Sequence, residues 1–187
     1  MVEDEDGDLA MSRDELESAS KELIGWRIEL ARLASSHIER VGLQLWAGAL
    51  VLSDLLLQRP HLVQGRQVVE LGAGLGLVSL LAHRLAAGHV CCTDGHSEAL
   101  AMSRENLLRN GAKDRVSFEQ VRWEEPPGDS GIWQGEVLLA ADVIYDTEAA
   151  DAFARLCARL RLGEKDTPNA PKPSKTSYVW YAYTIHI

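Results

Sequence analysis

The sequence has no apolar run long enough to cross a membrane, because its two longest apolar stretches are interrupted by Ser53-Asp54 and by His83-Arg84. Its start, MVEDEDGDLAMSRDEL, also lacks the basic residues and the apolar stretch of a secretory signal. We therefore expect a soluble protein of the nucleus or cytoplasm, with no membrane partner.

Cysteine is scarce, with three residues among 187, and its spacing matches no metal motif. Cys91 and Cys92 are neighbours in an apolar run, and Cys157 falls within a helical pattern. The six histidines are scattered, without the i, i+4 pair that is typical of a metal site. These absences predict reduced, buried thiols and no metal centre.

Positive charge is also low, since 19 Lys and Arg residues stand against 28 Asp and Glu residues, for a net charge of -9. Binding to a phosphate backbone depends on a surface rich in Lys and Arg, so direct binding to nucleic acid is not expected. Several of the acids lie between Glu3 and Asp8, and we interpret residues 1–20 as an acidic, disordered tail. A basic protein partner for this tail is the alternative interpretation.

What the chain does contain is an alternation of strand-like and helix-like segments. The spacing of Ser12 and Glu15 predicts a capped helix at 13–23, residues 25–42 fit either a hairpin or a helix, and apolar periodicity predicts a helix at 43–58. The segments that follow are strands at 66–71, 89–94, 115–121 and 135–145 and helices at 76–87, 97–110 and 147–162.

This alternation predicts an α/β fold with a doubly wound, parallel sheet, formed by a single domain at 21–162. Residues 163–176 are rich in proline and lysine and predict a linker or insertion, and 177–187 predict a terminal strand. In such folds the ligand lies at the carboxyl ends of the strands. The residues at those ends are therefore the candidates for a site: Glu70, Asp94, Trp123 with Glu124 and Glu125, and Asp142 with Tyr145.

A glycine-rich turn follows the first of these strands, in the stretch VVELGAGLGL. Glycines let the backbone approach a ligand closely, because no Cβ intervenes and positive φ angles are accessible. Gly72, Gly74 and Gly76 have the spacing G-x-G-x-G, whereas a dinucleotide-binding turn has G-x-G-x-x-G and would need glycine in place of Leu77.

Two acids select among the possible ligands. Glu70, directly before the turn, would repel a pyrophosphate but suits a ligand with an ammonium group. Asp94 can accept hydrogen bonds from both hydroxyls of a ribose. Together they favour S-adenosylmethionine, which carries an ammonium group and no phosphate.

The motifs VVELGAGLGL, CTDG, RW and ADVIYD, preceded by GLQLWAGALVLSDLLL, resemble those of the seven-strand protein-lysine methyltransferases that carry an Asp-x-x-Tyr signature. The likeness extends from about Val41 to Leu162. It implies a Rossmann-like class I methyltransferase that transfers a methyl group from S-adenosylmethionine to the lysine side-chain amine of a non-histone protein.

The resemblance also implies roles for particular residues. Trp46 would close over the cofactor, Trp123 would flank the adenine, and Ala141 would contribute backbone beside the active site. The glycine turn would surround the methionine end of the cofactor through Gly72, Ala73, Gly74 and Gly76. Asp142 would orient the target amine and Tyr145 would form a wall of the lysine channel.

Each of these residues also has a structural interpretation. The glycines could serve only a tight turn, and the two tryptophans could pack in the core. Asp94 could cap the helix that begins near Ser97, and Asp142 could simply end a strand, with Asp146 or Thr147 as the cap of the next helix.

The resemblance stops at the linker. The family continues with more helix and an antiparallel hairpin, whereas this sequence has YVWYAYTIHI, so we interpret the sheet as truncated after its fifth strand. A truncated, non-catalytic cofactor-binding or interaction protein is therefore a second hypothesis. An NAD-dependent oxidoreductase is disfavoured by Glu70 and Leu77, and a methyltransferase acting on another acceptor stays open.

Overall fold

The computed structural model describes residues 2–3, 9–10, 27–31, 43–126, 128, 131–162 and 177–178. The helix predicted at 13–23 and the linker predicted at 163–176 lie outside these residues. The chain divides into two compact units, Met1–Leu30 and Ala31–Ile187. In the first unit β1 (Val2–Glu3) pairs antiparallel with β2 (Leu9–Ala10), within the tail that is predicted to be disordered.

The second unit contains a parallel sheet whose strand order is β5-β4-β3-β6-β7. The chain proceeds outward from β3 to β5, then returns to the other side of β3 and continues with β6 and β7. The predicted doubly wound, parallel sheet is confirmed. Its strands are β3 (Gln67–Leu71), β4 (His89–Asp94), β5 (Val116–Gln120), β6 (Val137–Leu139) and β7 (Ser177–Tyr178).

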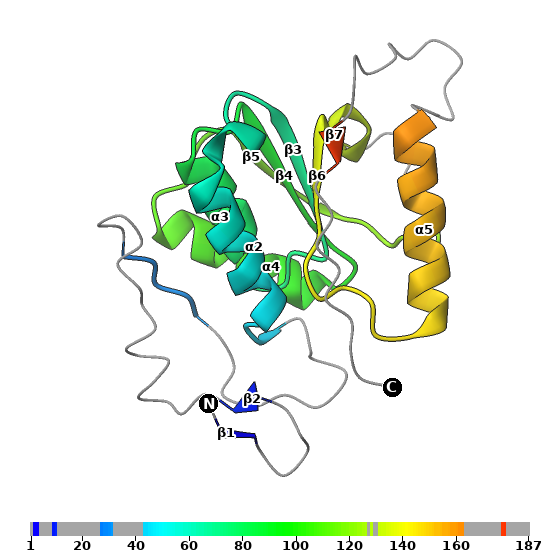
Figure 1. Cartoon of the computed structure of the whole chain (residues 1–187), viewed down its shortest axis with the longest axis horizontal. Helices are drawn as coiled ribbons and strands as arrows, with labels where there is room; N and C mark the ends of the chain where they lie inside the picture. Colours follow the sequence, from blue (N-terminus) through cyan, green and yellow to red (C-terminus); the bar gives the residue numbers. More distant parts are fainter. Residues whose placement is uncertain are drawn as a thin grey trace. The chain divides into compact units, whose positions relative to one another are not determined.

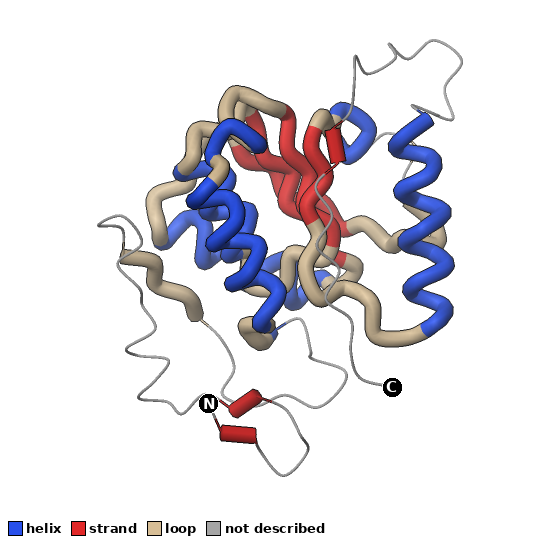
Figure 2. The backbone as a smooth tube through the Cα atoms, viewed as in Figure 1, coloured by secondary structure: helices blue, strands red, loops and turns tan. Residues whose placement is uncertain are grey.

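Helices cover both faces of this sheet. The helices that precede β5 in the chain lie on one face and α5 (Thr147–Leu162) lies on the other, as Figure 1 shows, and Figure 2 shows the strands between them. Within the described part of the chain, no helix has the length and apolarity needed to cross a membrane. The helices are α2 (Ala47–Gln58), α3 (Leu77–Arg84), α4 (Ser97–Arg109) and α5 (Thr147–Leu162), with short 3-10 turns η2 (Pro60–Leu62) and η3 (Gly131–Gln134).

The core has a layer on each side of the sheet, because strands of a parallel sheet are apolar on both faces. On the α5 side, Phe153 and Leu156 pack in one buried cluster with Val69, Leu71 and Leu138 of the strands. On the other side, the largest fully buried side chains come from α2, α3 and α4: Leu52, Leu56, Leu80, Leu81 and Leu107. Leu52 with Leu56 on α2 and Phe153 with Leu156 on α5 have the i, i+4 and i, i+3 spacing that places side chains on one face of a helix.

The predicted strand at 135–145 is wrong in its length, since β6 ends at Leu139. Asp142 has a φ of 52°, in the left-handed region, so the chain cannot continue as a strand through it. Val143 is nevertheless buried, at 4% exposure. Apolar residues beyond Leu139 therefore fill the core from a loop, which a hydrophobic pattern alone does not distinguish from a strand.

We expect Leu156→Ala to lower the free energy of unfolding by about 2–5 kcal/mol, because it leaves a cavity between α5 and the sheet. The matched control is Leu108→Ala on α4, where the side chain is 44% exposed and the loss should stay below about 1 kcal/mol. Urea unfolding of both variants measures the difference. Equal losses would show that α5 does not pack as described.

Candidate functional site

The glycine turn connects the carboxyl end of β3 to the start of α3. Gly72, Gly74 and Gly76 have φ angles of 68°, 52° and 77°, a region that other residues seldom adopt. At Gly72 a side chain is excluded by packing as well, because a Cβ there would lie 2.7 Å from Cγ1 of Val143. The turn therefore needs glycine for its own geometry, and the close approach of a ligand to these glycines stays a prediction.

Asp94, the last residue of β4, holds this turn in place. Its Oδ2 accepts a hydrogen bond from the backbone N–H of Gly74 at 2.9 Å, and its Oδ1 accepts one from the N–H of His96 at 2.9 Å. Asp94 is buried, with 6% of the residue exposed. Neither bond goes to an amide inside α4, which begins at Ser97, so Asp94 does not cap that helix. Each carboxylate oxygen has two lone pairs and can accept a second hydrogen bond, so the group can still bind a diol.

Glu70 lies one strand away and is 3% exposed. Its Oε2 accepts hydrogen bonds from the backbone N–H of Ser79, at 2.8 Å, and from the Ser79 hydroxyl. Ser79 is in the first turn of α3, whose N-cap is Gly76, so Glu70 provides the cap that glycine cannot. Burial raises the pKa of Glu70 to about 7, the bonds from Ser79 oppose this rise, and the negative charge of Asp94 adds to it.

Asp142 makes the corresponding contact with α2. Its Oδ2 accepts a short hydrogen bond from the backbone N–H of Gly48, in the first turn of that helix. Burial raises the pKa of the Asp142 carboxyl, and the bond from Gly48 partly offsets this rise. Neither this contact nor the one between Glu70 and Ser79 is predicted from the sequence.

Tyr145 lies on the surface, with 61% of the residue exposed. Its pKa is raised, first by the partial burial of the phenol and then by the negative charges of Asp146, Asp94 and Glu124. The phenol is therefore in an acidic part of the molecule that includes the end of β4. Asp146 also caps α5, because its Oδ1 accepts a hydrogen bond of 2.6 Å from the N–H of Ala149, which confirms one of the two predicted caps.

The two tryptophans occupy different surroundings. Trp46 is the N-cap residue of α2, with an extended backbone, no capping bond from its side chain and 37% exposure. Trp123 is partly buried, and its ring centroid lies 5.1 Å from that of Phe153 on α5. Its Cζ2 would lie 3.5 Å from a Cβ at Gly72, so this ring fills the space between α5 and the first glycine. The structure thus gives Trp123 a packing role, and its contact with adenine stays a prediction.

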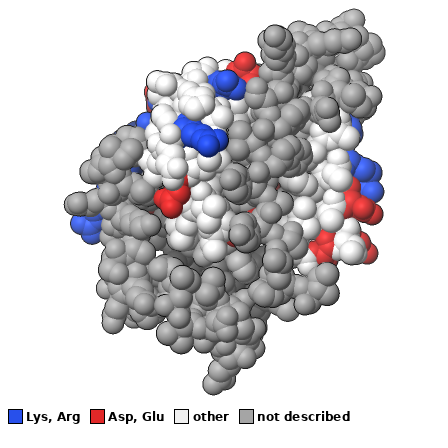
Figure 3. Space-filling model, viewed as in Figure 1, with Lys and Arg blue, Asp and Glu red and all other residues white. Residues whose placement is uncertain are grey.

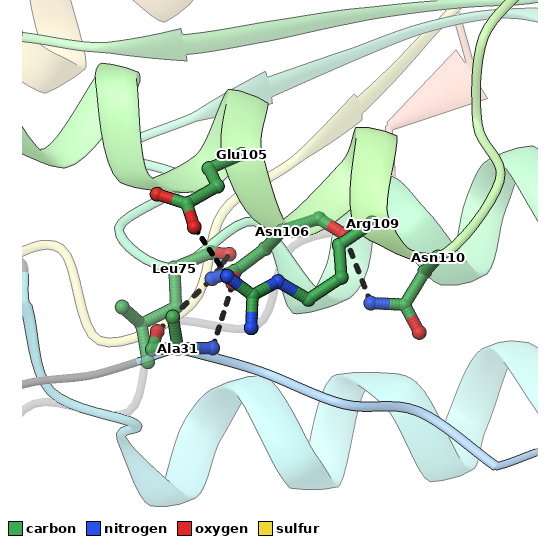
Figure 4. Close-up of polar contacts among 6 residues, drawn as sticks. All are labelled: Ala31, Leu75, Glu105, Asn106, Arg109 and Asn110. Atoms are coloured by element: carbon green, nitrogen blue, oxygen red, sulfur yellow. Dashed lines mark hydrogen bonds and ion pairs between the residues drawn. The ribbon is translucent and has the colours of Figure 1, made fainter.

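Asn106 on α4 is hydrogen-bonded to the glycine turn through the carbonyl of Leu75. This contact was not predicted from the sequence. Asn106 is fully buried, and its Nδ2 donates to the carbonyl oxygens of Leu75 at 3.0 Å and of Ala31 at 3.1 Å, while its Oδ1 accepts from the N–H of Ala31 at 2.7 Å. Figure 4 shows these bonds beside the ion pair of Glu105 and Arg109. A polar residue on the apolar face of a predicted helix is the sequence signal that could have identified it.

The site therefore consists of a glycine turn, strand-end carboxylates and aromatic rings at the carboxyl edge of β3, β4 and β6. Ala73 belongs to the turn and donates its N–H to the carbonyl of Thr93 at 2.9 Å, and Ala141 is half-buried in the loop after β6. Among the residues that the structure describes, no group of three or more His, Cys, Asp or Glu side chains is arranged to bind a metal.

A doubly wound, parallel sheet with such a turn after β3 and an acid at the end of β4 defines a Rossmann-like fold of the class I methyltransferase type. Residues 29–172 match a model of the lysine methyltransferase family, so the chain belongs to that family. The methyl donor that this membership implies is S-adenosylmethionine.

Curated relatives agree with this assignment. The motifs of the sequence also resemble those of methyltransferase-like protein 22, and the Mus musculus protein of that name is 34% identical over 153 residues, covering 71% of this chain and 39% of the relative. Protein-lysine N-methyltransferase EEF2KMT of Mus musculus is 29% identical over 162 residues, covering 77% of this chain and 44% of the relative. The chain thus spans less than half the length of these relatives.

A solved structure supports the fold. A candidate RNA methyltransferase of Pyrococcus horikoshii superposes with a TM-score of 0.54 at 21% identity, over 79% of this chain and 67% of that one. At this identity the likeness concerns the fold alone.

The residues around the turn fit this cofactor. Asp94 has lone pairs for ribose hydroxyls beside the Gly74 amide. In a dinucleotide-binding protein the pyrophosphate occupies the N-terminus of the helix after the turn, whereas here the Glu70 carboxylate already accepts the Ser79 amide of that helix. The site is therefore suited to a nucleoside without phosphate.

We expect Glu70→Gln to change how stability depends on pH. The folded-state pKa of Glu70, about 7, is above the ordinary value of 4.5, so the folded chain binds a proton that the unfolded chain has lost. The stability that this proton contributes is complete below the unfolded pKa and is lost as the pH rises to about 7.

Urea unfolding from about pH 4 to about pH 8 measures this effect as the difference between the wild type and Glu70→Gln. The wild type should lose about 3 kcal/mol relative to the variant over that range, and most of the loss should fall between the two pKa values. A difference that stays constant with pH would contradict the burial of this carboxyl.

Proposed function

We propose that this chain binds S-adenosylmethionine at the carboxyl edge of its sheet and transfers the methyl group to the lysine side-chain amine of a non-histone protein. The observation that supports this proposal is the hydrogen bond between Gly74 and Asp94, which joins the glycine turn to the acid that would bind the ribose, in a member of the lysine methyltransferase family. The activity of the whole protein is part of the proposal, because the chain spans 39% and 44% of the relatives named above.

The cofactor would lie across the ends of β3 and β4. Asp94 would accept the ribose hydroxyls, and Gly72, Ala73, Gly74 and Gly76 would surround the methionine end. Trp46, at the first turn of α2, would cover the cofactor, and its ring suits a sulfonium by cation-π attraction. Trp123 would flank the adenine from its position against Gly72, and Ala141 would contribute backbone beside the methyl group.

Glu70 would act on the ammonium group of the cofactor through its charge. Because burial raises its pKa to about 7, a nearby ammonium would stabilise the ionised carboxylate and release the proton that it holds at neutral pH. Its bonds with Ser79 keep the carboxylate at the start of α3, close to the turn.

The target lysine must arrive as a neutral amine, since its ordinary pKa is about 10.4. The lysine ammonium would therefore lose a proton to water before the reaction, and bound S-adenosylmethionine would supply the methyl group to the neutral amine and leave as S-adenosylhomocysteine. Asp142 would orient the amine and Tyr145 would form a wall of its channel, so the rate depends on alignment and on exclusion of water.

The charges support a protein acceptor. Tyr145 lies near the charges of Asp146, Asp94 and Glu124, which would attract a cationic lysine from solution and repel a phosphate backbone. On the described part of the face in Figure 3, acidic and basic side chains are interspersed and do not form a basic stripe. This arrangement favours a protein over a nucleic acid as the partner.

We expect Asp94→Asn to weaken binding of S-adenosylhomocysteine by about 10- to 100-fold, because the amide keeps only one of the two acceptor oxygens and loses the charge. Asp151→Asn, the same change at an exposed position of α5, is the matched control and should bind like the wild type. Calorimetric titration measures both. A folded wild type that gives no binding heat would overturn the proposed function.

Variants of Tyr145 test whether the chain transfers the methyl group to lysine. Tyr145→Ala should lower the rate of methyl transfer to protein lysines by about tenfold or more, since it removes the channel wall, whereas Tyr145→Phe keeps the ring and should retain most of the rate. Labelled S-adenosylmethionine and an undermethylated protein extract provide the assay, and mass spectrometry identifies N-methyl-lysine. Binding of cofactor without transfer by the wild type would favour the non-catalytic alternative.

A further inference from the structure

The contact between α2 and the loop after β6 joins two segments that lie 94 residues apart in the chain. The start of α2 and the loop that follows β6 are at the same end of the sheet in Figure 1. The Asp142 carboxylate accepts the Gly48 N–H, and its φ of 52° sets the direction in which the carboxylate points. Aspartate and asparagine tolerate this backbone conformation better than most residues.

This contact replaces a cap that α2 does not make for itself. Its N-cap residue, Trp46, forms no capping bond with its side chain, and the first turn contains no acidic residue. The amides of a first helical turn need an acceptor, and the helix dipole favours a negative charge there. Asp142 provides both the acceptor and the charge from a different part of the chain.

Close packing at this contact leaves no room for a side chain at position 48. A Cβ at Gly48 would lie 2.6 Å from Oδ2 of Asp142 and 2.7 Å from its Cγ, closer than such atoms can approach. Glycine at position 48 is therefore explained by the carboxylate that lies against it.

The same loop also reaches the glycine turn. Val143, the next residue after Asp142, is buried, and its Cγ1 would lie 2.7 Å from a Cβ at Gly72. A continuous set of contacts thus connects the Trp46 end of α2, through Asp142 and Val143, to the first glycine of the turn.

We propose that Asp142 is a positioning residue that holds the Trp46 end of α2 against the glycine turn, so that cofactor affinity depends on its contact with Gly48. The inference rests on the proposed function for the identity of the cofactor. It adds to the amine-orienting role a task that Asp142 performs when no acceptor protein is present.

The test compares variants at both partners by calorimetric titration with S-adenosylhomocysteine alone. Asp142→Gly keeps the backbone conformation but removes the cap, and should weaken binding by about tenfold, as loss of a helix cap suggests. Asp142→Asn keeps the acceptor oxygen and should restore most of that loss. Unchanged affinity in Asp142→Gly, with slower lysine methylation, would overturn the inference and assign Asp142 to the amine only.

Gly48→Ala provides the reciprocal test. In the wild-type background its methyl group meets the carboxylate, and affinity should fall by about tenfold. In the Asp142→Gly background the obstacle is gone and alanine favours the helix, so the same change should cost nothing or improve binding. Losses that simply add in the double variant would contradict a direct contact.

Two further measurements distinguish a failure of the proposed Asp142 contact from a failure of the proposed cofactor binding. Val51→Gly weakens α2 at an exposed position away from Asp142 and should bind like the wild type; an equal loss there would refute a specific role for the contact. Amide hydrogen exchange at Gly48 and Ala49 should become faster in Asp142→Gly, and unchanged exchange would refute the cap. This exchange is measured without ligand, so it reports on Asp142 even if the wild type binds no S-adenosylhomocysteine and the proposed function fails.

Discussion

Three carboxylates, two near the ends of β3 and β4 and one in the loop after β6, each accept a backbone N–H at the same edge of the sheet. Glu70 binds the Ser79 amide, Asp94 binds the Gly74 amide, and Asp142 binds the Gly48 amide. Buried carboxylates must be hydrogen-bonded, and the first turns of helices have amides without partners. Each carboxylate thus gains a donor and each amide an acceptor, and these bonds connect the starts of α2 and α3 and the glycine turn to this edge of the sheet.

The same arrangement determines which ligand the edge can accept. Its acids disfavour an anion, and the Ser79 amide at the N-terminus of α3 already has an acceptor in Glu70. The acids would repel a phosphate at this helix end. The Ser79 amide could not bind the phosphate either, because it already donates to Glu70. A cationic nucleoside meets the opposite conditions, since its ammonium and sulfonium groups gain from the carboxylates and from aromatic rings.

Hydrophobic periodicity predicts most of the fold, because the strands and helices of a doubly wound sheet bury nearly every apolar residue. Strands β3 and β4 and helices α4 and α5 agree with their predicted ranges to within about a residue. The prediction is wrong at 135–145, where the apolar run continues but the φ of Asp142 ends the strand. The hydrophobic pattern of the sequence does not reveal a backbone angle that depends on a tertiary contact.

The candidate site shows the same division. The residues at strand ends can be identified from the sequence, because the topology brings them to one edge of the sheet. The glycines of the turn can be identified by their spacing. The partners of those residues cannot, because Ser79, Gly48 and Asn106 belong to helices whose packing decides the contact. Trp123 illustrates the limit: its sequence position suits an adenine, whereas its ring packs on Phe153.

The location of the bound cofactor tests the central claim most directly. A crystal structure with S-adenosylhomocysteine should show the ribose hydroxyls within hydrogen-bonding distance of Asp94 and the amino-acid end beside Gly72 and Gly74. A ligand bound away from the carboxyl edge of β3 and β4, or one whose ribose makes no contact with Asp94, would contradict it.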